Sequence, residues 1–236
     1  YPSGSDITNY ELTEKQKQDY SKADLFVYNG LSEEKSIARD FINKNKNMKI
    51  IDVSYGLNLE YSNYDEELWL SPNNFLMLAT TVKNNLSEFI SSKYIKEEIN
   101  KNYEKIQEQV SIIDANLRNI ASTSKASDNN VIITSTNALK FLENYGFKVI
   151  SIEDDDNYTT ELKNNFKSGK YKTLFIKKGE SNDKINELKD TYKAKNVEVN
   201  MMDVLDDNER KNNEDYLSIM NSFLQNISDT CLNESK

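Results

Sequence analysis

The feature that most constrains the fold of this chain is a run of apolar residues spaced four and three apart through its middle. This spacing places one apolar stripe along a single α-helix, about 40 Å long at a rise of about 1.5 Å per residue. The intervening positions are mostly Lys, Glu, Gln and Asn, so we expect only one side of the helix to be buried. A coiled coil would produce this pattern, and so would a helix that lies across two lobes. The stripe consists of Ile95, Ile99, Tyr103, Ile106, Val110, Ile113, Leu117 and Ile120.

Strand and helix patterns alternate on both sides of this segment, which favours the helix across two lobes. Apolar, β-rich runs predict strands at residues 25–28, 49–53, 131–134, 148–152, 173–177 and 197–202. Amphipathic runs predict further helices at residues 72–89, 137–145, 159–166, 183–193 and 212–224. We therefore predict an α/β fold of two lobes, each with a mostly parallel sheet flanked by helices, joined by one long rigid helix. The expected domains are an N-terminal lobe at 1–91, a linking helix at 92–122 and a C-terminal lobe at 123–236.

Two helix starts have favourable capping residues. Ser32 precedes Glu33 and Glu34, which predicts an N-cap followed by acidic residues in the first turn. Ser71-Pro72 predicts a cap followed by proline at the first helical position.

The composition excludes several classes of function. A net charge of −9 without a basic stripe argues against a nucleic-acid partner, because such binding depends on Lys and Arg. The chain has no histidine and one cysteine, Cys231, which rules out a Ser-His-Asp or Cys-His arrangement, a Cys-rich zinc site and an intramolecular disulfide. GxGxxG, Walker A and GxSxG sequences do not occur. We therefore expect no enzymatic activity; catalysis by a pair of carboxylates is the least supported alternative that the 39 acidic residues leave open. We interpret the acidic run at 153–156 as a solvated loop.

Four segments, taken in order, carry a more specific pattern. They are GSDITNYE at 4–11 with SKADLFVYNGL at 21–31, DEELWLSPNN at 65–74, TSTNAL at 134–139 with YG at 145–146, and MDVL at 202–205 with DYLSIM at 215–220. The second is similar to D-P-H-x-W-L-D-P-x-N and the third to T-S-H-x-A-F…Y-G. Together the segments resemble the metal-type solute-binding proteins of bacterial ABC importers, the zinc and manganese receptors, over nearly the whole chain.

This resemblance implies a receptor outside the cytoplasmic membrane, on the cell surface or the periplasmic side. Such a receptor captures a divalent metal between its lobes and delivers it to a membrane permease. We expect a monomer whose only attachment to the membrane is a lipid anchor. The family's first strand and helix would precede Tyr1, and the absence of an initiator Met suggests a processed N-terminus.

The family's metal ligands fall on four residues of this sequence. Thr8 and Glu67 occupy two histidine positions, Thr136 occupies a position that is His or Glu in relatives, and the fourth position retains Asp203. Zinc prefers nitrogen and sulfur donors, whereas oxygen ligands suit Mn²⁺, Ca²⁺ or Mg²⁺. The resemblance thus implies a site for a divalent metal, which is Mn, Zn or Ca. The alternatives are a site for another solute and a chain that binds no metal.

The alternative is a binding-protein scaffold that has lost metal binding and acts as a surface interaction or adhesion module. In this interpretation Thr8 and Thr136 cap a loop or helix, Glu67 is a solvated loop residue, and Asp203 accepts backbone hydrogen bonds at a strand end. A cleft filled by side chains would favour this alternative.

Overall fold

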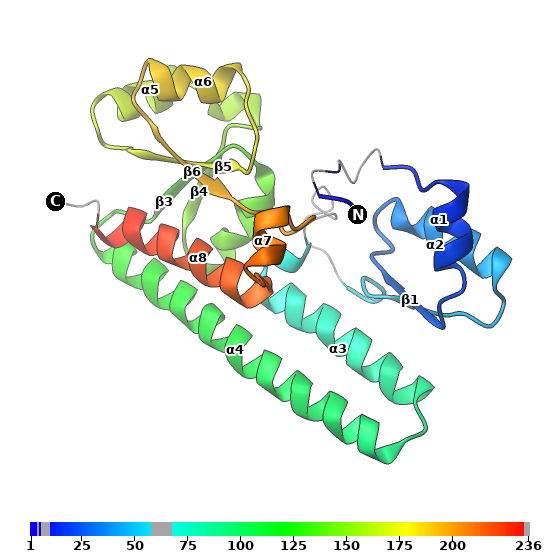
Figure 1. The fold of residues 1–236 in the computed structure, drawn as a ribbon. Helices are drawn as coiled ribbons and strands as arrows, with labels where there is room; N and C mark the ends of the chain where they lie inside the picture. Colours follow the sequence, from blue (N-terminus) through cyan, green and yellow to red (C-terminus); the bar gives the residue numbers. More distant parts are fainter. Residues whose placement is uncertain (4, 6–9, 58–67, 234–236) are drawn as a thin grey trace. The chain divides into compact units, whose positions relative to one another are not determined.

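The computed structural model describes all residues except 4, 6–9, 58–67 and 234–236 (Figure 1). The chain divides into two compact units, Tyr1–Val110 with Asp203–Arg210, and Ser111–Met202 with Lys211–Lys236. One helix, α4 (Lys93–Ala126), passes from the first unit into the second. The predicted α/β fold with two parallel sheets and a long helix is confirmed, while the domain limits at 91 and 122 stay a prediction.

The first unit contains a two-stranded parallel sheet. Its elements, in chain order, are α1 (Glu14–Tyr20), β1 (Leu25–Tyr28), α2 (Glu34–Lys44), β2 (Lys49–Asp52), η1 (Leu68–Leu70), α3 (Pro72–Phe89), the first half of α4 and most of α7 (Asp207–Lys211). Phe26 and Tyr28 point to the same face of β1 because strand side chains alternate. Phe41 of α2 meets Phe26 edge-on at 4.9 Å, so α2 covers this face. Lys49 of β2 lies over the ring of Phe89 in α3.

A single carboxylate joins the carboxyl ends of the two strands. Asp52 Oδ1 accepts hydrogen bonds from Gly30 N at 2.9 Å, Ser54 N at 3.0 Å and Ser54 Oγ at 2.6 Å. Gly30 approaches so closely that a Cβ atom there would overlap the Asp52 carboxyl group. The Asn29-Gly30 turn is therefore held against the end of β2, and glycine is required for this contact.

The second unit contains a four-stranded parallel sheet in the order β4-β3-β5-β6. Its elements are the end of α4, β3 (Val131–Thr134), η2 (Asn137–Tyr145), β4 (Lys148–Ser151), η3 (Asp155–Asn157), α5 (Thr160–Lys167), β5 (Thr173–Lys177), α6 (Asp183–Asp190), β6 (Lys195–Val199), α8 (Tyr216–Ser228) and η4 (Asp229–Asn233). Leu174 and Ile176 of β5 point to one face, and Phe175 points to the other, where it meets Phe223 of α8 edge-on at 6.4 Å. Both faces of β5 are thus covered, which explains the three consecutive apolar residues at its centre, Leu174, Phe175 and Ile176.

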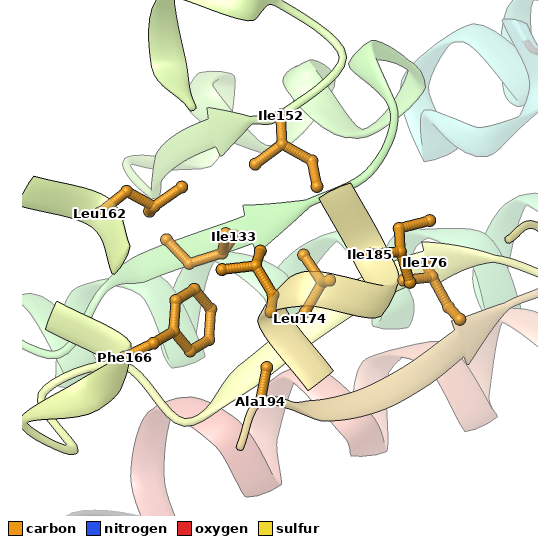
Figure 2. Close-up of a cluster of buried hydrophobic side chains, with 9 residues drawn as sticks. Ile133, Ile152, Leu162, Phe166, Leu174, Ile176, Ile185 and Ala194 are labelled. Atoms are coloured by element: carbon orange, nitrogen blue, oxygen red, sulfur yellow. The ribbon is translucent and has the colours of Figure 1, made fainter. Parts of the chain in front are cut away.

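One hydrophobic core cluster of the second unit lies between this sheet and the helices α5 and α6 (Figure 2). Strand residues supply one side of it, and the helices supply Leu162, Phe166, Ile185 and Leu188, spaced three or four apart. The cluster consists of Ile133, Ile152, Leu162, Phe166, Leu174, Ile176, Ile185, Leu188 and Ala194.

The apolar stripe of α4 is buried unevenly along its length. Val110 and Leu117 are fully buried, whereas 45% of Ile95 and 36% of Ile106 is exposed. In the first unit, α4 contacts α3, where the hydroxyls of Tyr103 and Thr80 lie 2.7 Å apart. The even stripe in the sequence therefore does not correspond to even burial.

Several predicted boundaries are wrong by a few residues. The last strand spans Lys195–Val199 rather than 197–202, because Met202 has a positive φ of 58° that strands do not adopt. The helix predicted at 183–193 ends at Asp190, and Lys193 has φ 61°. The helix predicted to start at residue 212 begins at Tyr216, where Asp215 forms a capping box with Ser218.

Helix type and helix starts also differ in places from prediction. Residues 137–145 form a 3₁₀ helix. The N-cap of α2 is Glu33 rather than Ser32, although the Ser32 hydroxyl accepts a hydrogen bond from Glu34 N at 3.3 Å. Ser71 is the N-cap of α3, and Pro72 is its first residue as predicted. Within the described residues, no helix is both long and apolar enough to cross a membrane.

Candidate functional site

The four predicted ligand positions are described to different extents. Thr8 and Glu67 lie outside the described residues. Thr136 belongs to the second unit and Asp203 to the first, so each is described in its own surroundings. In the part of the chain that the structure covers, no cluster of three or more His, Cys, Asp or Glu residues is suited to hold a metal.

Thr136 caps the helix η2 directly after strand β3. Its backbone is extended, with φ −132° and ψ 144°, and its hydroxyl oxygen accepts a hydrogen bond from Ala138 N at 3.2 Å. Its own N–H donates to Thr134 Oγ1 at 3.2 Å. Threonine here has the geometry and the hydrogen bond of an N-cap residue, and its oxygen keeps acceptor capacity beyond this one bond.

The neighbouring Ser135 is held by a short hydrogen bond. Its hydroxyl donates to Glu180 Oε2 at 2.5 Å and accepts from Lys177 N at 3.1 Å. Ser135 N also donates to the carbonyl oxygen of Phe175 at 2.8 Å. These contacts fix the end of β3 to β5 and so set the position of Thr136.

Two carboxylates of the acidic run hold the start of η2 from the other side. Glu153 Oε2 accepts from Asn137 N at 2.6 Å, and Asp154 accepts from Asn137 Nδ2 and Lys140 Nζ, both at 2.8 Å. The hydrogen bonds from Lys140 and Asn137 lower the pKa of the Asp154 carboxyl below its ordinary value. The run is therefore not simply a solvated loop, because these carboxylates anchor η2 beside Thr136.

The far end of η2 is fixed to α4 through Tyr145. Its hydroxyl donates to Asp114 Oδ1 at 2.7 Å, and the guanidinium of Arg118 binds the same carboxylate at 2.9 Å while lying over the tyrosine ring. Burial raises the pKa of Tyr145, and the hydrogen bond to Asp114 raises it further. Burial also raises the pKa of Tyr216 at the start of α8.

The raised pKa of Tyr145 predicts a loss of stability in alkali. The folded protein holds this phenol proton more tightly than the unfolded chain, whose tyrosines titrate near pH ~10. The stabilisation is therefore complete below pH ~10 and is lost as the pH rises toward the folded pKa. Tyr145→Phe should make the fall in unfolding free energy above pH 10 shallower by about 1.4 kcal/mol per pH unit. Urea unfolding between pH 9 and 11 checks this, with the exposed Tyr94→Phe as control; an equal slope in both variants would contradict it.

Asp203 follows the last strand, β6, and accepts a backbone hydrogen bond within its own loop. Its Oδ1 accepts a hydrogen bond from Val204 N at 2.9 Å. Just before it, Asn200 Oδ1 accepts from Met202 N at 2.8 Å, which supports the positive φ of Met202. The segment after β6 thus turns sharply and presents Asp203 at the start of the following loop.

The chain has two α/β units, each with a parallel sheet, and a long helix that passes from one unit to the other. These features define the class of two-lobed solute-binding proteins. The family of the periplasmic component A of the zinc-uptake complex matches residues 1–230. This chain therefore belongs to that family, whose members are metal-binding receptors of ABC importers outside the cytoplasmic membrane rather than enzymes.

Solved structures support the same fold. The chain is similar to the metal-dependent lipoprotein YcdH from Bacillus subtilis, with 22% identity, a TM-score of 0.80, and coverage of 98% of this chain and 89% of that one. It is similar to the Zn(II)-bound ZnuA-like domain of AdcA from Streptococcus pneumoniae, with 23% identity, TM-score 0.78 and coverage of 98% and 88%. It is also similar to the periplasmic zinc-binding protein TroA from Treponema pallidum, with 19% identity, a TM-score of 0.72, and coverage of 98% of this chain and 89% of that one. A search of curated protein sequences gives no match.

Proposed function

We propose that this chain is the receptor of an ABC importer that binds a divalent cation through oxygen atoms, with Glu67 and Asp203 as charged ligands and Thr8 and Thr136 as neutral ones. The proposal rests on one observation: the chain belongs to the zinc-uptake family and yet contains no histidine. The one cysteine, Cys231, is fully buried. With nitrogen and sulfur ligands removed, the donors left suit a harder cation such as Mn²⁺, Ca²⁺ or Mg²⁺.

The local geometry of the two described positions is compatible with this role. Asp203 Oδ1 accepts a hydrogen bond from Val204 N at 2.9 Å, which fixes this carboxylate at the start of its loop. Thr136 is held from both sides by Ser135 and the Glu153–Asp154 pair. A ligand oxygen that is already fixed loses little conformational freedom when a cation binds.

Thermal unfolding of the metal-stripped protein tests the proposal. Mn²⁺, Ca²⁺ or Mg²⁺ at 100 times its dissociation constant should stabilise the folded state by about 2.7 kcal/mol. Glu67→Ala/Asp203→Ala should abolish the shift in unfolding midpoint, because two threonine hydroxyls cannot neutralise a divalent ion. Glu104→Ala/Glu108→Ala removes the same charge from exposed positions of α4 and should leave the shift intact.

A second candidate function is a surface interaction module on a scaffold without metal. The observation that favours it is that Thr136 and Asp203 each accept a hydrogen bond from a backbone N–H of their own loop. These bonds give both residues a structural role without any cation. If no cation shifts the unfolding midpoint, the oxygen-ligand proposal fails and this second function takes its place.

The proposed receptor delivers its cation to the membrane permease of the importer. We expect it to be held at the membrane by a lipid anchor and to act as a monomer. Both expectations come from the family resemblance of the segments at 21–31 and 65–74.

A further inference from the structure

A polar cavity of about 420 Å³ opens in the second unit at the amino ends of three strands. Its walls include Val131, the first residue of β3, Lys148, the first residue of β4, and Thr173, the first residue of β5. Cavities that hold small molecules begin at about 300 Å³. This one is therefore large enough for a small ligand.

Positive charge dominates the described lining. Three lysines, Lys148, Lys170 and Lys172, line the cavity at exposed positions, and Asp128 is the one acidic residue in the described lining. The chain as a whole carries a net charge of −9, so this excess of lysine runs against its overall charge.

Hydrogen bonds hold the walls of the cavity in place. Asn130 Nδ2 donates to the carbonyl oxygen of Gly146 at 2.7 Å, and Asn129 Nδ2 donates to that of Cys231 at 2.7 Å. Lys195 N donates to the carbonyl oxygen of Lys172 at 2.8 Å, which fixes the start of β5 to β6. A cavity with a fixed frame binds a ligand at a lower cost in ordering.

The cavity lies at the opposite end of the sheet from Thr136. All four strands are parallel, so their amino ends share one edge and their carboxyl ends share the other. Thr136 follows the carboxyl end of β3, whereas Lys148 and Thr173 stand at the amino ends of β4 and β5. The cavity and the proposed cation ligand of this unit are therefore separate sites.

We propose that this cavity binds an anion of the phosphate type, either free phosphate or pyrophosphate or the headgroup of an anionic phospholipid. Lysine binds phosphate as a compact point charge with three N–H donors. Three lysines that line one polar cavity offer N–H donors to a group with several charged oxygens. The two sources share this chemistry and differ in whether the anion is presented by a bilayer surface.

Calorimetric titration with phosphate and pyrophosphate tests the free anion, and cosedimentation tests vesicles of phosphatidylglycerol against vesicles of phosphatidylcholine. We expect the protein to bind at least one of phosphate, pyrophosphate and phosphatidylglycerol vesicles, and not to bind phosphatidylcholine vesicles. Lys148→Gln/Lys170→Gln/Lys172→Gln should weaken this binding by tenfold or more, since about tenfold corresponds to one charge-assisted hydrogen bond. Lys101→Gln/Lys105→Gln/Lys189→Gln removes the same charge from exposed positions that do not line the cavity, and this variant should bind as the unaltered protein does.

Circular dichroism of both triple variants checks that they fold, and the single variant Lys170→Gln, at an exposed position, provides a milder version of the same test. Binding of pyrophosphate alone assigns the site to a free anion, and binding of phosphatidylglycerol vesicles alone assigns it to a membrane surface. The proposal is overturned if the unaltered protein binds neither phosphate, nor pyrophosphate, nor phosphatidylglycerol vesicles. It is also overturned if both triple variants lose binding equally.

Discussion

Replacing Gly30 by alanine is expected to destabilise the first unit by about 3 kcal/mol. The added methyl group would overlap the Asp52 carboxyl group. If this group moves away, it loses its hydrogen bonds to Gly30 N, Ser54 N and Ser54 Oγ. Crowding of this kind costs about 1–3 kcal/mol by itself, and each hydrogen bond lost from a charged group adds about 1.5–3 kcal/mol. Local movement of the Asn29-Gly30 turn relieves part of the overlap, so the expected cost is smaller than the sum of these contributions.

Fluorescence of Trp69, the sole tryptophan, follows unfolding of the first unit in urea. Asp52→Ala serves as the background control, because it removes the atoms that an alanine at position 30 would meet. On that background Gly30→Ala should cost less than about 1 kcal/mol, which gives a coupling energy of about 2 kcal/mol. Equal costs in the two backgrounds would mean that the carboxylate is not the obstacle.

The parts of the fold that sequence predicts well are those where the burial pattern is simple. Residues 25–28, 131–134 and 173–177 form strands as predicted, since each is a short apolar run in a parallel sheet. The helix Pro72–Phe89 also agrees with prediction, because Pro at its first position and Ser before it mark the start.

Other parts depend on information that apolar periodicity does not contain. The helix α1 has no buried residue, so its sequence shows no apolar stripe. A capping box of Thr13 and Gln16 marks its start and is the signal that could have identified it. The strand β6 begins with the polar residues Lys195 and Asn196, which join the sheet because they pair with Thr173 and Leu174 of β5.

The contacts that hold the segment around Thr136 are not predictable from the sequence. Glu153, Asp154 and Glu180 hold the segment around Thr136, yet each lies 17 or more residues away from it in sequence. Such contacts depend on the strand order β4-β3-β5, which places the carboxyl ends of three strands beside one another. A single sequence shows the acidic residues and does not show which backbone groups they meet.

Restoring histidine at the three substituted positions is expected to convert the protein into a tight zinc receptor. The change is Thr8→His/Glu67→His/Thr136→His, with Asp203 kept as the fourth ligand that we propose. Zinc favours imidazole nitrogen in a four-coordinate shell, so Zn²⁺ should become the most stabilising cation in place of Mn²⁺, Ca²⁺ or Mg²⁺. At 1,000 times its dissociation constant, Zn²⁺ should stabilise the variant by about 4 kcal/mol.

The variant should be less stable than the unaltered protein when metal is removed. Thr136 caps η2 through its hydroxyl, and loss of an N-cap side chain costs about 1 kcal/mol. Thermal unfolding with and without each cation measures both effects, and Lys101→His/Glu108→His/Lys189→His provides three histidines at exposed positions that should not respond in the same way. A zinc shift of the same size in both variants would mean that the four positions do not form a site. A shift confined to the first variant would mean that these four positions together bind zinc once three of them carry imidazole.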